Sequence, residues 1–222
     1  MARAQLESLL RARRLDVTLS TAAPWRESHA PDLAATGVAA VDAGLGGGLR
    51  RGHVSEIVGP RSSGRTVVLC HALAAAAARG ELVALIDTSD RFDPASASTT
   101  GLDLSRLLWV RGTGDAARAL KAAMLVLQAG GFGLVGFDLS DAPPAALRAF
   151  PFTTWLRLAR AIEGSSTIAL LMGTNRIARS PGGATIVLEP PAGAVRAAWS
   201  GSSHRARLLD GVELRARVVS GW

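Results

Sequence analysis

The residues best suited to chemistry form one short run, Gly59-Pro60-Arg61-Ser62-Ser63-Gly64-Arg65-Thr66. This run follows an apolar segment of strand length and opens an apolar segment of helix length, which is the setting of a phosphate-binding loop. Glycines permit the turn in which successive backbone N–H groups converge on a phosphate, and the N-terminal end of the following helix adds partial positive charge. Thr66 stands where a hydroxyl would hold magnesium. The sequence therefore predicts a loop shaped for the phosphates of a nucleotide.

One side chain of this loop departs from the pattern of a working nucleotide-binding loop. That pattern ends in Gly-Lys-Ser/Thr, whereas Arg65 takes the place of the lysine. A planar, bulkier guanidinium does not reproduce a compact ammonium that reaches between the β and γ oxygens. We therefore predict a degenerate loop, in which nucleotide binding is weak or lost and no residue is catalytic. The residues assigned to it are Gly59, Ser62, Ser63, Gly64, Arg65, Thr66 and Asp138.

Two aspartates, Asp87 and Asp138, end apolar segments that read as neighbouring strands. Three roles are open for Asp138: holding magnesium through water, capping the turn at Ser140, or forming an internal ion pair with Arg65. Asp87 is a second candidate for that ion pair. The single cysteine and the four histidines share no metal-ligand spacing, so we predict no metal site and no other cofactor, although ATP with magnesium stays a weak possibility.

Alternating segments predict an α/β fold. Apolar runs of strand length at 53–58, 82–87, 107–110, 134–138 and 167–172 alternate with helical stretches at 66–79, 115–129 and 144–163. Such alternation gives a mainly parallel twisted sheet between helices. After Asn175 the segments 184–189, 195–199 and 212–219 read as strands, which predicts an antiparallel C-terminal extension. In the last of these, Ala216 and Val218 are expected on one face and Arg217 on the other.

The N-terminal residues 1–31 are expected to form an amphipathic helix and a linker, ahead of a core at 32–222. They lack the apolar stretch of a signal peptide, and no run reaches the roughly 18 uncharged apolar residues of a membrane span, so we expect a cytoplasmic protein without membrane contact. Four apolar residues are candidates for a protein interface and for self-association: Leu6, Leu9, Leu10 and Trp222.

The net charge of +7 and the pI near 11.3 favour an acidic partner, either DNA or protein. All but one of the 25 basic residues are arginines, a bias that a GC-rich genome would also produce. Six arginines toward the C-terminal end are candidates for contact with DNA or a partner protein: Arg176, Arg179, Arg205, Arg207, Arg215 and Arg217.

Several stretches resemble the core of the bacterial RecA recombinase over residues 35 to 140. They are Ala35-Thr36-Gly37, Val41-Asp42, Leu45-Gly46-Gly47-Gly48-Leu49, Gly52, Glu56-Ile57-Val58-Gly59-Pro60, Ser62-Ser63-Gly64, Ala84-Leu85-Ile86-Asp87, Asp93-Pro94, Gly101-Leu102-Asp103, Leu107-Leu108 and Leu134-Val135-Gly136-Phe137-Asp138. The resemblance implies a P-loop fold whose strand at 134–138 is the Walker B strand.

The departures from RecA fall on the residues that do its chemistry. The family places a water-activating glutamate two positions after the aspartate matched by Asp87, where this chain has Ser89, and an adenine-stacking tyrosine where it has Ser96. The two DNA-binding loops of a recombinase are replaced by the short segments 140–144 and 177–183. Hydrolysis of ATP should therefore be negligible.

A shortened RecA core with a broken phosphate loop and an arginine-rich C-terminal end resembles ImuA, the RecA-like member of the bacterial mutagenesis cassette. The resemblance implies a non-catalytic accessory of SOS-induced DNA damage tolerance, which joins a Y-family polymerase homologue in translesion synthesis and also contacts RecA. Two alternatives remain open. One is a weak DNA-stimulated P-loop ATPase, which phosphate release would reveal, and the other is a SulA-like cell-division inhibitor, which would co-purify with the division tubulin.

Overall fold

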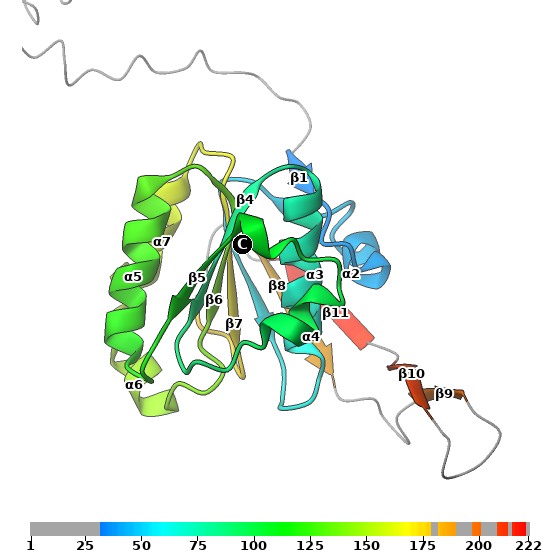
Figure 1. Cartoon of the computed structure of the whole chain (residues 1–222). Helices are drawn as coiled ribbons and strands as arrows, with labels where there is room; N and C mark the ends of the chain where they lie inside the picture. The colour runs from blue at the N-terminus through cyan, green and yellow to red at the C-terminus, as the bar shows by residue number, and fades with distance from the viewer. Residues whose placement is uncertain (1–31, 179–181, 190–196, 201–207, 213–214, 221–222) are drawn as a thin grey trace, which may run out of the picture. The chain divides into compact units, whose positions relative to one another are not determined.

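The computed structural model describes residues 32–178, 182–189, 197–200, 208–212 and 215–220 (Figure 1). Its centre is a seven-stranded sheet in the order β11-β8-β3-β7-β6-β4-β5. The strands are β3 Val54–Val58, β4 Leu82–Asp87, β5 Leu107–Arg111, β6 Phe132–Asp138, β7 Ile168–Gly173, β8 Ala184–Glu189 and β11 Arg215–Ser220. Six are parallel, and β11 pairs antiparallel with β8. The predicted fold class is confirmed.

Helices cover both faces of this sheet (Figure 1). On one face lie α2 Ala39–Gly44, α3 Arg65–Ala78 and α4 Pro94–Ser98, and on the other lie α5 Ala116–Ala129, α6 Pro144–Ala149 and α7 Phe152–Ile162. Val68 and Leu73 of α3 are fully buried in the first core, and Leu158 of α7 is 1% exposed in the second. Because both faces are covered, the central strands β4, β6 and β7 are apolar along most of their length, as the sequence indicated.

The segment 144–163 was expected to be one helix, and this prediction is wrong in one respect. Two helices occupy it, because Phe150 is extended (φ −73°, ψ 125°) and Pro151 is the N-cap of α7. A residue that precedes proline is disfavoured in the helical conformation, since the proline ring clashes with its backbone. The break turns the short α6 away from the line of α7 at the carboxyl end of the sheet (Figure 1).

The C-terminal segments form strands, but the single strand expected at 212–219 is two. Val212 ends β10 (Leu208–Val212), which pairs antiparallel with β9 (Ala197–Ser200), whereas β11 begins at Arg215 and joins the main sheet. Ala216 packs on the core while Arg217 is exposed, so the expected alternation of β11 is confirmed for these two residues.

The remaining elements are short. A two-stranded sheet pairs β1 Leu33–Ala34 with β2 Leu49–Arg50, and one 3₁₀ turn spans Leu104–Arg106. No helix within the described ranges is both long and apolar enough to cross a membrane. The predicted N-terminal helix with Leu6, Leu9 and Leu10, and also Trp222, lie outside the described residues, so the proposed boundary at residue 31 stays a prediction.

Candidate functional site

The phosphate loop joins β3 to α3 at the carboxyl end of the sheet, where Figure 1 draws it in cyan. Gly59 is required there, because a Cβ on it would lie 2.5 Å from the carbonyl oxygen of Leu188. Gly64 has φ +89° and is the N-cap of α3, a conformation that favours glycine. Thr66 follows in the first turn of α3 and is exposed. The backbone of a phosphate-binding loop is therefore formed.

Arg65 is nearly enclosed, with 8% of its surface exposed. Its Nη1 atom is buried and has no hydrogen-bond partner in the described part of the chain. Burial lowers the pKa of the Arg65 guanidinium, and the negative charges of Asp138 and Asp141 oppose that shift. Within the part of the chain that the structure describes, no ion pair joins Arg65 to Asp87 or Asp138. The internal ion pair that the sequence left open is therefore not formed.

Asp138 caps the turn that follows β6. Its Oδ1 atom accepts a hydrogen bond from the backbone N–H of Ser140 at 2.8 Å, which is one of the three roles open from the sequence. Burial raises the pKa of the Asp138 carboxyl, the Ser140 amide opposes the rise, and the adjacent Asp87 adds to it. Sheet register explains this proximity, since Asp87 and Asp138 are directly paired between β4 and β6.

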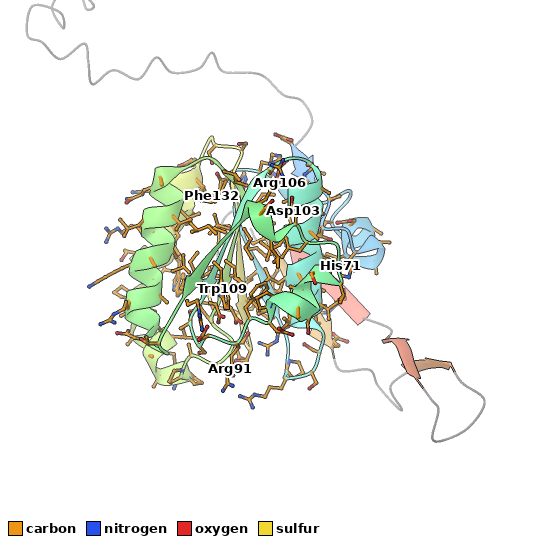
Figure 2. All side chains as sticks on the ribbon, in the orientation of Figure 1. His71, Arg91, Asp103, Arg106, Trp109 and Phe132 are labelled. Carbon is orange, nitrogen blue, oxygen red and sulfur yellow. The ribbon has the colours of Figure 1, made fainter. Side chains whose placement is uncertain are left out.

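The carboxylate of Asp87 holds the loop that follows β4. It is 1% exposed and accepts hydrogen bonds from the backbone N–H groups of Arg91, at 3.0 Å, and Phe92, at 2.8 Å. The indole Nε1–H of Trp109 on the edge strand β5 donates to the same carboxylate at 3.3 Å. Figure 2 labels Trp109, near the middle of the view, and Arg91 below it. With three donors from the chain itself, Asp87 has a structural role at this end of β4.

Asp141 links three loops, and nothing in its sequence spacing indicated this. Its Oδ1 atom lies 2.9 Å from Nη2 of Arg61 in the phosphate loop, and its Oδ2 atom lies 3.5 Å from Nε of Arg91. Both arginine side chains are more than 70% exposed, so the two ion pairs are screened by water and add little stability. Their effect is positional, because they hold charged groups across the mouth of the phosphate loop.

The residues that replace the RecA glutamate and tyrosine do not recover their chemistry. Ser89 is half-buried and carries no carboxylate, and the neighbouring Asp90 is bound by Arg111 through two hydrogen bonds of 2.8 and 2.7 Å. Ser96 is exposed on α4 and presents no aromatic face. Thus every carboxylate placed above beside the loop already accepts hydrogen bonds or ion pairs from this chain.

Four buried polar atoms near the loop nevertheless have no hydrogen-bond partner among the described residues: Ser63 Oγ, Arg65 Nη1, Thr88 Oγ1 and Ser140 Oγ. They come from the phosphate loop, from the first residue of α3 and from the segments that follow β4 and β6, two strands that α3 contacts. Buried polar groups are almost always hydrogen-bonded, so these atoms fit a phosphate or water at this place. The residues present therefore fit the binding of a phosphate group.

The predicted arginine contacts are scattered rather than gathered. Arg176 lies after β7 and is exposed, with its Nε atom 3.9 Å from Oε1 of Glu56. Arg217 pairs with Glu189 across the β11–β8 edge at 3.3 Å. Arg215 is placed only by its backbone in β11, and Arg179, Arg205 and Arg207 lie outside the described residues. The structure therefore brings none of the described candidates together.

Comparison with known proteins places the chain in a family. The family model described as "RecA N-terminal domain" matches residues 25–145, more than half of the 222 residues. The chain belongs to this RecA family. The RecA protein of Mycobacterium marinum is 43% identical over 105 residues, which are 46% of this chain and 30% of that protein. The RecA protein of Acidiphilium cryptum is 40% identical over 114 residues, or 50% of this chain and 33% of that protein.

The matched region spans about a third of the length of those RecA relatives. A solved structure, that of the RadB recombinase, is similar with a TM-score of 0.55 and 18% identity, covering 72% of this chain and 85% of that one. At this identity the similarity shows the RecA-like fold alone. The RecA resemblance drawn from residues 35 to 140 is confirmed, and the narrower resemblance to ImuA stays a prediction.

Proposed function

We propose that this chain is a non-catalytic RecA-like accessory protein of SOS-induced DNA damage tolerance, which acts in translesion synthesis by binding other proteins. Its proposed partners are the Y-family polymerase homologue of the mutagenesis cassette and RecA itself. One observation carries this proposal. The loop keeps the backbone of a phosphate cradle, while the nearby carboxylates are occupied by the chain's own donors and the position of the water-activating acid holds Ser89.

The expected rate of ATP hydrolysis follows from these replacements. Loss of a positioned general base costs on the order of 10²- to 10⁴-fold in rate. Replacement of the lysine by Arg65 removes a compact charge that stabilises the transferred phosphoryl group, and the unpaired guanidinium is buried beside the loop instead. Together these changes leave a scaffold whose contribution is binding rather than turnover.

Phosphate release by the purified chain tests this directly. We expect the wild-type protein and the double variant Thr66→Ala, Asp138→Asn to release phosphate from ATP at the same background rate, with and without single-stranded DNA. The same two proteins, tagged and purified from DNA-damaged cells, should recover the Y-family polymerase homologue equally well. Turnover that the double variant abolishes, or failure to recover either proposed partner, would contradict the proposal.

The second candidate is a weak DNA-stimulated ATPase, and the four unpartnered buried polar atoms favour it. An exposed Thr66 at the start of α3 also leaves a hydroxyl free for magnesium. A rate that rises with single-stranded DNA and depends on Thr66 selects this candidate. Direct contact with DNA and self-association are compatible with either function, and band-shift and sedimentation measurements on the same samples decide them.

A further inference from the structure

A groove lies at the carboxyl ends of β6 and β7, which is the end of the sheet that also carries the phosphate loop. Its cavity is about 560 Å³ and is formed by α6, the start of α7 and the loop after β7. The lining residues are Pro144, Leu147, Arg148, Phe150, Phe152, Trp155, Thr174, Asn175, Arg176 and Ile177. No residue of the proposed phosphate site lines it, so the groove is a separate surface.

The walls of the groove are apolar and aromatic. Phe150 and Trp155 pack edge to face with their ring centroids 6.0 Å apart, and Trp155 is 6% exposed. Phe152 stands beside them with 53% of its surface exposed, which is unusual for so large an apolar side chain. A cavity of this size has room for a large apolar side chain together with neighbouring atoms of a bound peptide.

The charges around this groove are all of one sign. Arg148 and Arg176 line it, and a neighbouring cavity of about 290 Å³ shares Phe150 and adds Lys121 and Arg157. Among the residues that the structure describes, no carboxylate lines either cavity. Among the ion pairs of the described residues, none involves Arg148, Lys121 or Arg157, so these cations are not neutralised by the chain itself.

One wall of the groove is formed by the loop after β7, and the buried side chain of Glu56 on β3 holds this loop in place. This buried residue accepts hydrogen bonds from the backbone N–H groups of Ile177, at 2.8 Å, and Ala178, at 3.1 Å. Its other oxygen accepts from the hydroxyl of Thr185 at 2.8 Å. A wall held in this way needs little ordering when a partner arrives, so less of the contact energy is lost on binding.

We propose that this groove docks an acidic peptide segment of a partner protein, with one large apolar side chain of the peptide in the 560 Å³ cavity. Carboxylates on either side of that anchor meet Arg148 and Arg176 at one end and Lys121 and Arg157 at the other. The inference rests on the proposed function, because it names the surface through which a partner protein is bound. The inference goes further by specifying the peptide that the groove binds, which is acidic and carries one large apolar side chain.

The shape of the groove favours a peptide over single-stranded nucleic acid. Bases bind by stacking on exposed aromatic faces that follow one another along a channel. Here Trp155 is buried and packs against Phe150, which leaves Phe152 as the exposed ring of the groove. A largely apolar groove with cations at its rim instead matches a hot-spot anchor surrounded by charge complementarity.

Selection of random twelve-residue peptides on phage against the full chain tests the chemistry. The enriched peptides should carry Asp or Glu on both sides of a Leu, Phe or Trp. One of them, labelled with fluorescein, is then titrated with protein and followed by anisotropy. Phe152→Ala and Arg148→Glu should each weaken its binding by at least about tenfold. Both side chains are exposed, so the variants should fold, which circular dichroism verifies.

Matched controls come from α5, outside both cavities. Leu125→Ala removes an exposed apolar side chain, and Arg118→Glu reverses an exposed charge; both should leave peptide affinity within about twofold. Enrichment of basic or unrelated peptides, or affinity that Phe152→Ala and Arg148→Glu leave unchanged, overturns the proposal. So does a labelled twenty-nucleotide oligothymidine that binds with the same dependence on these variants while the selected peptide does not displace it.

Recovery of the polymerase homologue separates this inference from the proposed function. If tagged Phe152→Ala protein still recovers that partner as well as wild type, the groove inference fails and the accessory function stands. If the wild-type protein binds the selected acidic peptide through the groove but recovers neither proposed partner, the groove inference stands and the assigned function fails.

Discussion

The phosphate loop and the groove at α6 and α7 both lie at the carboxyl ends of the parallel strands, but their charged side chains differ in how they are partnered. Around the phosphate loop, Asp87, Asp138 and Asp141 each accept donors from within the chain, and the guanidinium of Arg65 is buried. In the groove at α6 and α7, by contrast, Arg148, Lys121 and Arg157 have no ion-pair partner among the described residues, while Arg176 lies 3.9 Å from the buried Glu56. In the first region the carboxylates are held by donors of the chain itself, whereas in the second most of the cations lack such a partner among the described residues.

Under the proposed function, this fold has kept its shape while its use has moved from one site to another. Glycines and strand register maintain the phosphate loop, because these also determine how β3 and α3 pack. The side chains that touch a nucleotide are under no such constraint, so they can change without loss of the fold. Stability therefore preserves the outline of a site longer than it preserves its chemistry.

The two regions meet at Glu56, and its removal should have the largest effect. Glu56→Ala leaves three buried donors without an acceptor, each costing about 1–3 kcal/mol, so we expect the free energy of unfolding to fall by roughly 3–5 kcal/mol. Urea unfolding measures this. Glu56→Gln keeps an oxygen for the two backbone amides and should lose less than half as much. Equal losses would show that charge, not hydrogen bonding, determines the role of Glu56.

Restoring the RecA family's side chains at the phosphate loop should return part of its nucleotide chemistry and so make the loop, like the groove, a functional site. In the double variant Arg65→Lys, Ser89→Glu, a compact ammonium and a positioned carboxylate return together. We expect phosphate release from ATP to rise at least about tenfold above wild type, a change of about 1.4 kcal/mol in the barrier. Arg61→Lys, on the same loop but exposed, is the matched control. If the double variant stays at background, the loss of activity lies in other parts of the site.

The pH dependence of the free energy of unfolding should show how Asp138, beside the phosphate loop, contributes to stability. The folded pKa of Asp138 is raised above its ordinary value of 3.8, chiefly by burial, so the ionised form weakens the fold. Its favourable contribution is complete below the ordinary value and is lost as pH rises through the raised folded value. Asp138→Asn should therefore become more stable than wild type above that range, and the two should converge at low pH. Parallel curves of unfolding free energy against pH would contradict this.

The smallest expected effect is on the thiol behind the phosphate loop. Burial raises the pKa of Cys70 to about 11, and the nearby charge of Asp138 adds to the rise. Cys70 should thus react slowly with an aromatic disulfide reagent at pH 8, and Asp138→Asn should make it modestly faster. Because the unfolded thiol ionises near 9.0, stability should also decline between pH 9.0 and about 11. Arg118→Glu, distant on α5, serves as the control, and fast wild-type labelling would contradict the burial.

Much of the fold was predictable because each layer leaves a local signal. Apolar runs identified the buried parallel strands, and the glycines of the loop identified the β3–α3 turn. Two details were missed for local reasons: Phe150 before Pro151 breaks the helix, and Val212 belongs to a different sheet from Arg215.

The site was less predictable, since its contacts join residues far apart in the chain. The bridge from Asp141 to Arg61 and Arg91 exists only after three loops have come together. Glu56 did leave a signal that the sequence interpretation did not use, namely a single carboxylate within a buried strand whose other residues are uncharged. Such a residue is rarely buried without partners, so it could have been marked as the anchor of a distant loop.

The short distance along β3 has a consequence for how this chain can evolve. Two buried residues, Ile57 and Val58, separate the carboxylate that secures the groove wall from the glycine that begins the phosphate loop. A substitution in this stretch is therefore pleiotropic, since it disturbs both surfaces at once. Lineages that gave up nucleotide chemistry would still retain this segment almost unchanged, so its preservation among homologues is a poor sign of ATPase activity.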